Sequence, residues 1–268
     1  MRSLRGKTAV ITGAASGIGR ALAYRLAREK MRLVLADLDG RRLREVASGL
    51  PGALAIRTDV SRAADVESLA AKAYARFGAV HLLCNNAGVA EHGAVWEVPL
   101  ARWKRVIGTN LWGVIHGCVA FVPRMLAQRS PGHVVNTASM AGLVTPPLAG
   151  PYSATKHAVV AISEALAQDL ALRRARIGVS VLCPGFVATR LLHSAPGADP
   201  VVRALVAQGV SPDAIADRTV RAVRSDEFYV ITHPEMASAV RRRTEEILAG
   251  RAPAAAALRP RRSRAASR

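Results

Sequence analysis

Short apolar runs alternate with longer stretches of helical spacing along most of the chain, and this alternation restricts the fold more than any other feature. In seven such runs, apolar residues follow one another rather than occupying every second position. A strand with this pattern is buried on both faces, as happens in a parallel sheet covered by helices on either side. The runs span residues 8–12, 32–37, 53–59, 80–85, 133–139, 177–184 and 228–232.

The intervening stretches place apolar residues at the spacing of amphipathic helices. The clearest of them cover residues 19–30, 68–77, 103–126 and 152–172. The sequence therefore predicts an α/β fold, a doubly wound parallel sheet of about seven strands with helices on both faces. Because no shift in composition marks an internal boundary, residues 1–250 are expected to form a single domain, followed by a basic, disordered tail at 251–268.

The net charge of +19 at pH 7 raises the question of nucleic acid or an anionic membrane as a partner. Six arginines lie in the tail RAPAAAALRPRRSRAASR, which has no helical or strand periodicity. A compositional bias toward Arg and Ala accounts for the charge more simply than a binding function does. Nucleic-acid binding is therefore not expected.

No apolar run approaches the length of about 18 residues that spans a bilayer. The longest candidate, residues 111–126, is interrupted by His116, Pro123 and Arg124 and is predicted to be a buried or interface helix. The apolar stretch near the start, residues 8–11, is too short for a signal peptide. These features predict no membrane insertion and a cytoplasmic location.

The cysteines and histidines give no indication of a metal site. Cys84, Cys118 and Cys183 are odd in number, lack metal-ligand spacing and sit among apolar residues, which predicts buried free thiols. The seven histidines form no metal-binding motif. No metal is expected.

A glycine-rich turn follows the first expected strand and opens the first expected helix. Its sequence is TGAASGIG, residues 12–19. Glycines at such a turn let backbone amides approach a pyrophosphate at the positive end of the helix dipole. The candidate cofactor contacts in this turn are Gly13, Ser16, Gly17, Ile18 and Gly19.

The second expected strand ends at Asp37. A carboxylate at this position can accept hydrogen bonds from the adenosine ribose and repels a 2′-phosphate, which favours NAD over NADP. Arg41 and Arg42 could turn toward such a phosphate, so NADP stays the alternative. If Asp37 has a structural role instead, it is expected to be a helix N-cap, and this role is compatible with cofactor binding.

Together these segments resemble the short-chain dehydrogenase/reductase family, in its single-domain, Rossmann-like form. TGAASGIG is similar to the family's cofactor turn, and CNNAG at 84–88 to the motif that ends its fourth strand. PGFVAT at 184–189 resembles the loop on the nicotinamide side. The resemblance covers residues 7 to about 249 and implies a catalytic domain. The catalytic residues that it implies are Asn110, Ser139, Tyr152 and Lys156.

The resemblance also implies cofactor contacts at the ends of other strands. Asp59 is expected at the adenine amino group with Val60 beside the ring, and Thr189 at the carboxamide of the nicotinamide. Asn86, Ala87 and Gly88 are expected along the ribose. The full set on this side is Asp59, Val60, Asn86, Ala87, Gly88, Tyr152, Lys156, Pro184, Gly185, Val187 and Thr189.

The spacing of Tyr152 and Lys156 has a chemical reason. A hydride moving to or from a carbonyl carbon requires a proton donor or acceptor near the oxygen, and a free tyrosine pKa near 10 is too high for a base at pH 7. Lys156 lies one helical turn on and, together with an oxidised nicotinamide ring, is expected to lower that pKa by about 2 to 3 units. Ser139 is expected to bind the substrate oxygen. By resemblance, Asn110 is expected to hold a water that connects Lys156 to solvent.

The expected substrate pocket has mostly apolar walls, at residues 89–96, 143–148 and 186–206, with Trp96 prominent and no arginine pair. A medium-sized apolar or aryl secondary alcohol, or the matching ketone, is the predicted substrate. Residues 193–200 are a candidate lid. LAGPYSATK, VPRML and FYVITHPEM are similar to bacterial family members that oxidise benzylic alcohols of lignin-type aryl compounds.

Two other functions stay open at this point. One is NADPH-dependent ketone reduction in biosynthesis, and the other is a non-catalytic nucleotide-sensing or scaffold protein. The stretches 103–126 and 152–172 carry more apolar surface than one sheet face can cover, which predicts a homodimer or homotetramer. The physiological substrate, the reaction direction and the stereochemistry cannot be deduced from the sequence.

Overall fold

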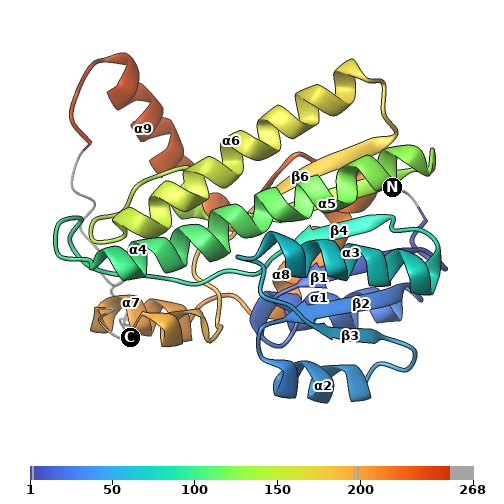
Figure 1. Cartoon of the computed structure of the whole chain (residues 1–268). Helices are drawn as coiled ribbons and strands as arrows, with labels where there is room; N and C mark the ends of the chain where they lie inside the picture. Colours follow the sequence, from blue (N-terminus) through green and yellow to red (C-terminus); the bar gives the residue numbers. More distant parts are fainter. Residues whose placement is uncertain (2, 196, 198, 254–268) are drawn as a thin grey trace, which may run out of the picture.

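A seven-stranded parallel sheet forms the centre of the molecule (Figure 1), in the order β3-β2-β1-β4-β5-β6-β7. The structure is a computed structural model that describes residues 1, 3–195, 197 and 199–253. The predicted doubly wound sheet is confirmed, and most of the predicted tail lies outside the described residues. The strands are β1 Thr8–Thr12, β2 Arg32–Asp37, β3 Leu54–Arg57, β4 Leu82–Asn85, β5 Gly132–Thr137, β6 Ile177–Cys183 and β7 Tyr229–Ile231.

Helices cover both faces of this sheet. The α-helices are α1 Gly17–Arg28, α2 Gly40–Ser48, α3 Ala63–Phe77, α4 Leu100–Ile107, α5 Gly113–Ala127, α6 Gly150–Leu172, α7 Pro200–Ala207, α8 Pro212–Ser225 and α9 Ala237–Leu248. A π-helical turn, η1, spans Gly108–Trp112. Short 3-10 turns are η2 Met140–Gly142, η3 Leu191–Ser194 and η4 Pro234–Met236.

The continuous apolar runs are explained by two cores, one on each face of the sheet. In β1, Ala9 and Ile11 belong to the core that contains residues of α1, α2 and α8, whereas Val10 belongs to the core with residues of α3 and α5. Every residue of β1 is buried. Burying a leucine, isoleucine or valine side chain contributes about 1.5 to 3 kcal/mol, so both faces stabilise the sheet.

The strand order reverses at β1, which pairs with β2 on one side and β4 on the other. The loops after β1 and β4 therefore run in opposite directions from the same sheet edge. In open α/β sheets this reversal leaves a crevice at the carboxyl ends of the strands, where ligands bind. The fold thus places the glycine-rich turn after β1 and the CNNAG segment after β4 at a common edge.

The helix expected at 103–126 begins earlier, at Leu100, and the turn Gly108–Trp112 divides it into α4 and α5. By length and apolar composition alone, Leu100–Ala127 would suffice to cross a membrane, which is weak evidence because core helices meet the same criterion. Phe121 and Met125 of α5 are buried in the core with residues of α3. The helix is therefore part of the packed α/β layer, as predicted from the sequence.

Two helices near the carboxyl edge differ from the rest. Neither α7 nor α9 contains a fully buried residue. In Figure 1, α9 projects at the upper left and α7 lies at the lower left, on the two sides of the edge where α4 and α6 begin. These helices complete the wall of a cavity while contributing little to the core.

Candidate active site

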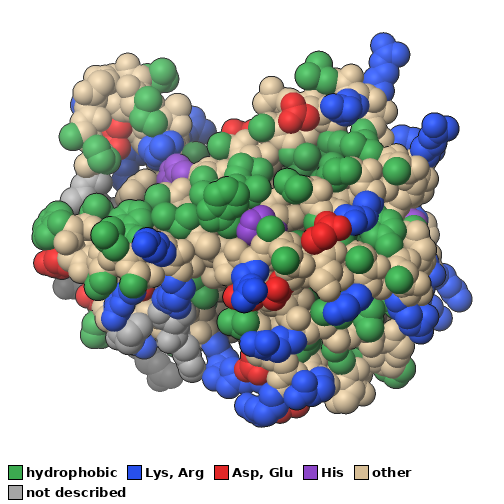
Figure 2. Space-filling view, viewed as in Figure 1, with side chains coloured by type: hydrophobic (Ala, Val, Ile, Leu, Met, Phe, Trp, Pro, Cys, Tyr) green, Lys and Arg blue, Asp and Glu red, His purple; other side chains and the backbone are tan. Residues whose placement is uncertain are grey.

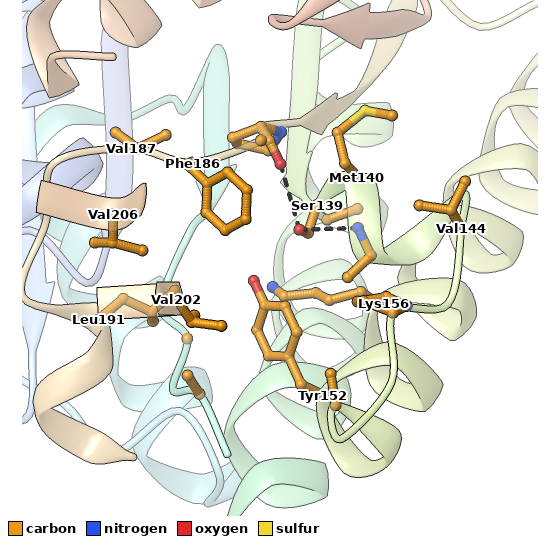
Figure 3. Close-up of a pocket in the computed structure, with 18 of the residues that line it drawn as sticks. Ser139, Met140, Val144, Tyr152, Lys156, Phe186, Val187, Leu191, Val202 and Val206 are labelled. Atoms are coloured by element: carbon orange, nitrogen blue, oxygen red, sulfur yellow. Dashed lines mark hydrogen bonds between the residues drawn. The ribbon is translucent and has the colours of Figure 1, made fainter. Parts of the chain in front are cut away.

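A cavity of about 1000 Å³ lies at the carboxyl edge of the sheet and extends from the glycine-rich turn to α9. Figure 3 shows part of its lining. The predicted site residues that line it are Gly13, Ser16, Gly17, Ile18, Asp37, Asn86, Gly88, Ser139, Tyr152, Lys156, Pro184, Gly185, Val187 and Thr189. Gly19, Asp59, Val60, Ala87 and Asn110 are not in the lining.

The glycine-rich turn has its shape because side chains are excluded from it. Gly13 has φ +68°, and a Cβ there would lie 2.8 Å from Cα of Ala87. A Cβ on Gly19 would lie 2.1 Å from the carbonyl oxygen of Gly13, so α1 packs directly on the turn. Ser16 is the N-cap of α1 and its side chain makes no cap hydrogen bond. Its hydroxyl and the first amides of α1 therefore remain suited to an anion.

Asp37 connects the end of β2 to this turn. Its Oδ2 accepts a hydrogen bond from the Ala15 amide at 3.0 Å, and its Oδ1 accepts one from the Asp39 amide at 2.9 Å. The N-cap of α2 is Asp39, which accepts from the Arg42 amide, so the helix-cap interpretation of Asp37 is wrong. A carboxylate has about four acceptor positions, and two of those on Asp37 remain for ribose hydroxyls.

The arginines that follow Asp37 have different surroundings. Arg41 forms an exposed ion pair with Glu45, with 2.6 Å between Nη1 and Oε1. Arg42 lines the cavity and its Nε lies 3.5 Å from Oδ2 of Asp39. Arg42 is therefore the nearer candidate of the two to meet a 2′-phosphate.

The segment after β4 is attached to β1 through Thr12. The Thr12 hydroxyl accepts hydrogen bonds from the amides of Asn86 at 2.9 Å and Ala87 at 3.1 Å. The Asn86 side-chain amide donates to the Thr12 carbonyl at 3.0 Å. Asn86 and Gly88 line the cavity, while Ala87 packs behind it against Gly13.

The structure does not bring the end of β3 into the cavity. Oδ1 of Asp59 accepts from the amide and hydroxyl of Ser61, at 3.0 and 2.7 Å. Val60 packs against Gly113, because a Cβ added to Gly113 would lie 2.8 Å from Cγ2 of Val60. The expected contacts of Asp59 and Val60 with the adenine therefore stay predictions.

Tyr152 and Lys156 lie in the first turns of α6 and both line the cavity. Nζ of Lys156 donates to the carbonyl of Thr137 at 2.8 Å and lies 5.6 Å from the centroid of the Tyr152 ring. Burial lowers the pKa of Lys156 to about 8. Even so, Lys156 is mostly protonated at pH 7. It can therefore serve as the cation beside the Tyr152 phenol.

The pKa of Tyr152 is raised in the chain alone, whereas the lowered pKa expected from the sequence includes the charge of an oxidised nicotinamide ring. Burial raises this pKa, and the hydrogen bond with Ser139 lowers it only in part. The reason is that the low-dielectric surroundings disfavour a phenolate more than the nearby Ser139 hydroxyl favours it. In the chain alone, Tyr152 is therefore a neutral proton donor.

Ser139 lies two residues after the end of β5 and caps the 3-10 turn η2. Its Oγ accepts from the Ala141 amide at 3.1 Å and donates to the Pro184 carbonyl at 3.3 Å, as the dashed lines in Figure 3 show. Hydroxyl donors usually lie 2.7 to 2.8 Å from their acceptors, so the bond to Pro184 is weak. The Ser139 hydroxyl can exchange that bond for one to another oxygen at small cost.

Asn110 lies in the π-helical turn and is fully buried. Its Oδ1 accepts from the Val89 amide at 2.8 Å, and its Nδ2 donates to the Val89 carbonyl at 2.9 Å and to the Thr155 hydroxyl at 3.2 Å. The side chain thus fixes the loop after β4 to α6. Its role in a water-mediated proton path stays a prediction.

The loop that begins at Pro184 is held by a histidine that sequence reasoning missed. The Gly185 amide donates to Nδ1 of His233 at 3.0 Å, so the proton of the neutral ring is on Nε2, which donates to the Phe186 carbonyl at 3.1 Å. A Cβ on Gly185 would lie 2.7 Å from this ring. His233 lies in the FYVITHPEM segment, far from this loop in the sequence. No local pattern predicts that the histidine contacts the loop.

The part of the cavity near Tyr152 is apolar (Figure 3), with Val144, Leu191, Val202 and Val206 pointing into it. The expectation for Trp96 is wrong, because this side chain is 85% exposed and does not line the cavity. The expectation of no arginine pair at the pocket is also wrong. The stretch 186–206 supplies Arg190, and α9 supplies Arg242 and Arg243.

The cysteines do not take part in this site as nucleophiles. Cys84 and Cys183 are buried as predicted, and Cys118 is partly buried. Burial raises the pKa of Cys84 and Cys183 to about 12 and that of Cys118 to about 11. Thiols with such pKa values are unreactive near neutral pH. Within the described residues, no three His, Cys, Asp or Glu side chains are grouped to hold a metal ion.

Comparison with known proteins identifies the family. The model of the short chain dehydrogenase family matches residues 7–198. The chain belongs to the short-chain dehydrogenases. It is an oxidoreductase of the class that acts on CH–OH groups.

Three similar proteins place the whole domain in this family. A short-chain dehydrogenase/reductase from Burkholderia phymatum, solved in complex with NAD, is 41% identical, with a TM-score of 0.89 over 94% of this chain and 98% of that one. The 1-deoxy-11-beta-hydroxypentalenate dehydrogenase of Streptomyces avermitilis is 39% identical over 87% of this chain and 86% of its own. A 3-ketoacyl-(acyl-carrier-protein) reductase from Brucella melitensis, complexed with NADH, is 31% identical, with a TM-score of 0.76 over 85% and 96%.

Proposed function

We propose that this short-chain dehydrogenase is NAD-dependent and interconverts a secondary alcohol and its ketone on a medium-sized apolar or aryl skeleton. The observation that carries the proposal is one cavity that contains Ser139, Tyr152 and Lys156 together with the glycine-rich turn and Asp37. Similarity to a dehydrogenase named for a hydroxylated compound and to a relative solved with NAD supports it.

The residues present fit a dinucleotide. Ser16 and the start of α1 offer donors to the pyrophosphate, and Asp37 keeps acceptor positions for the adenosine ribose. Lys156 uses one of its three N–H donors on Thr137, which leaves two for the nicotinamide ribose. When bound, NAD supplies the position that accepts the hydride from the carbinol carbon.

The side chains around Tyr152 handle the proton. Ser139 holds the substrate oxygen by exchanging its weak bond to Pro184, and the Tyr152 hydroxyl donates a proton to that oxygen during ketone reduction. In alcohol oxidation, the phenolate of Tyr152 takes the proton, and the cation of Lys156 offsets its charge. Because burial raises the pKa of Tyr152, oxidation is expected to increase with pH.

The test is formation of NADH from secondary alcohols such as 1-phenylethanol and decan-2-ol, with Tyr152→Phe as the inactive variant. Loss of the general acid/base is expected to lower kcat by about 10²- to 10⁴-fold while NADH binding persists. Tyr74→Phe is the matched control, because it removes a hydroxyl that bonds to Gln128 outside the cavity.

Two results would contradict the proposal. One is a Tyr152→Phe enzyme as active as the wild type. The other is NADH binding without turnover of any alcohol or ketone, which would favour the nucleotide-sensing alternative.

Biosynthetic ketone reduction with NADPH is the second candidate. It is supported by Arg42, which lines the cavity near Asp37, and by similarity to the 3-ketoacyl reductase. That relative is solved with NADH, so the similarity itself does not favour NADPH. Preference for NADPH over NADH distinguishes this candidate.

A homodimer or homotetramer and a cytoplasmic location stay predictions. Apolar side chains gather over α5 and α6 on the face shown in Figure 2. Trp112 and Val119, beside and within α5, are 49% and 70% exposed. Such an apolar surface supports self-association through these helices.

A further inference from the structure

One face of α9 brings arginines into the wall of the substrate cavity. Ala239, Arg242, Arg243, Glu246 and Ile247 all line it and lie three or four residues apart, which is the spacing of one helical face. Arg242 is exposed and Arg243 is half-buried, so these residues lie at the rim, next to solvent.

These arginines lack the acidic partners that many others in this chain have. Arg102 and Arg105, for example, both pair with the buried Glu91, at 3.3 and 3.2 Å. In the part of the chain that the structure describes, neither Arg242 nor Arg243 forms an ion pair, and the same holds for Arg190 and Arg251 at the same cavity.

The acidic groups of the cavity do not cancel this charge. Asp37 accepts two backbone hydrogen bonds at the end of β2, and Glu91 is neutralised by its two arginines. Glu246 of α9 is the remaining carboxylate among the described lining residues. The substrate end thus carries an excess of positive charge, with Arg190, Arg242, Arg243 and Arg251 against one glutamate.

The same cavity is apolar around Tyr152, where Val144, Leu191, Val202 and Val206 contribute its surface. A ligand that satisfies both regions has an apolar skeleton with an anionic group. Guanidinium groups bind a carboxylate through paired hydrogen bonds. Glu246 on the same helix face disfavours a doubly charged phosphate more than a singly charged carboxylate.

We propose that the substrate is an apolar hydroxy acid, or the corresponding keto acid, and that Arg242 and Arg243 bind its carboxylate. This site presupposes the alcohol oxidation proposed above and specifies which alcohol is accepted. Tyr152 and Ser139 hold the hydroxyl, the apolar wall holds the skeleton, and α9 selects for the acid. Arg242 and Arg243 are therefore specificity-determining residues.

The kinetic test compares 9-hydroxydecanoate with its methyl ester and with decan-2-ol, which share the secondary alcohol and the alkyl chain. The wild-type kcat/KM is expected to be about 10- to 100-fold higher for the acid, as charge-assisted hydrogen bonds suggest. Arg242→Gln and Arg243→Gln should each lower this preference about tenfold, because KM rises much more for the acid than for decan-2-ol, which has no carboxylate. Arg241→Gln is the matched control, since Arg241 lies on α9 outside the cavity lining.

A binding measurement separates this proposal from the proposed function. Each protein, saturated with NADH, is titrated calorimetrically with decanoate, and the dissociation constant should rise about tenfold in Arg242→Gln and Arg243→Gln but not in Arg241→Gln. If this holds without turnover of any alcohol, the carboxylate site stands and the proposed function fails.

Three results would overturn the carboxylate site. The first is equal kcat/KM for the acid and its methyl ester. The second is an equal loss of the preference for the acid in Arg241→Gln, which would mean that the preference comes from the overall positive charge of α9. The third is a preference for 3-hydroxydecanoyl-coenzyme A that depends on the same arginines, which would assign them to a phosphate.

Discussion

The nucleotide half and the substrate half of this cavity share one sheet edge but are built differently. On the nucleotide side, α1 buries Leu22, Ala23 and Leu26 completely, and a Cβ on Gly19 would reach within 2.1 Å of the Gly13 carbonyl. On the substrate side, neither α7 nor α9 contains a fully buried residue. The nucleotide half is shaped by close backbone packing that tolerates almost no substitution. The substrate half is shaped by side chains that can be substituted without disturbing the core.

The largest expected effect is that of Gly19→Ala in the nucleotide half. The new methyl group would meet the Gly13 backbone at a distance that no rotamer relieves, so the turn and α1 must separate. The free energy of unfolding should fall by about 3 kcal/mol, at the upper end for overpacking, and NADH affinity should fall with it. Urea unfolding and NADH fluorescence titration measure the two effects.

Val202→Ala is the matched control in the substrate half. Val202 lines the cavity from α7, a helix without fully buried residues. Its replacement should leave the free energy of unfolding within about 0.5 kcal/mol of the wild type and change KM for the alcohol instead. Equal destabilisation by both substitutions would remove the distinction between the two halves.

The sheet itself is expected to respond to pH through His133, a buried residue at the start of β5. The Ser180 hydroxyl donates to the Glu227 carbonyl at 2.6 Å and therefore accepts from Nε2 of His133 at 2.8 Å, which leaves Nδ1 without a hydrogen-bond partner. Burial lowers the pKa of His133 to about 4; the Asp226 carboxylate raises it and the amino terminus lowers it further.

The direction of the pH effect follows from proton binding. Between pH 4 and 6.5 the unfolded chain binds more protons at His133 than the folded chain. The free energy of unfolding should therefore fall as the pH drops through this window, by at most about 3 kcal/mol. Urea unfolding at the two ends of the window should show a smaller fall for His133→Asn; an equal fall in both proteins would contradict the assignment.

The strands could be predicted because each is a continuous apolar run, and the glycine-rich turn because its position between a strand and a helix is local. The helix α8 could also have been found, since Ser211 caps it, Pro212 follows, and Ile215 and Thr219 are one turn apart and buried. The π-helical turn at Gly108–Trp112 has no such local signal.

The contacts across the site could not be predicted, because they join distant segments. The side-chain amide of Asn110 joins Val89 to Thr155, two residues far apart in the sequence. His233 holds Gly185 from the other end of the sequence. In the sequence, Arg242 and Arg243 lie shortly before the basic tail, and only the packing of the chain brings them to the cavity.

The most direct test of the central claim, an NAD-dependent dehydrogenase, is fluorescence titration of the purified protein with NADH and NADPH, repeated with Asp37→Ala. We expect clear preference for NADH in the wild type, and a smaller preference in the variant, because the carboxylate that binds the ribose and repels a 2′-phosphate is removed. Preference for NADPH in the wild type would contradict the role of Asp37 and assign Arg42 to the phosphate. If neither nucleotide binds, the conclusion that the protein is a nicotinamide-dependent dehydrogenase is contradicted.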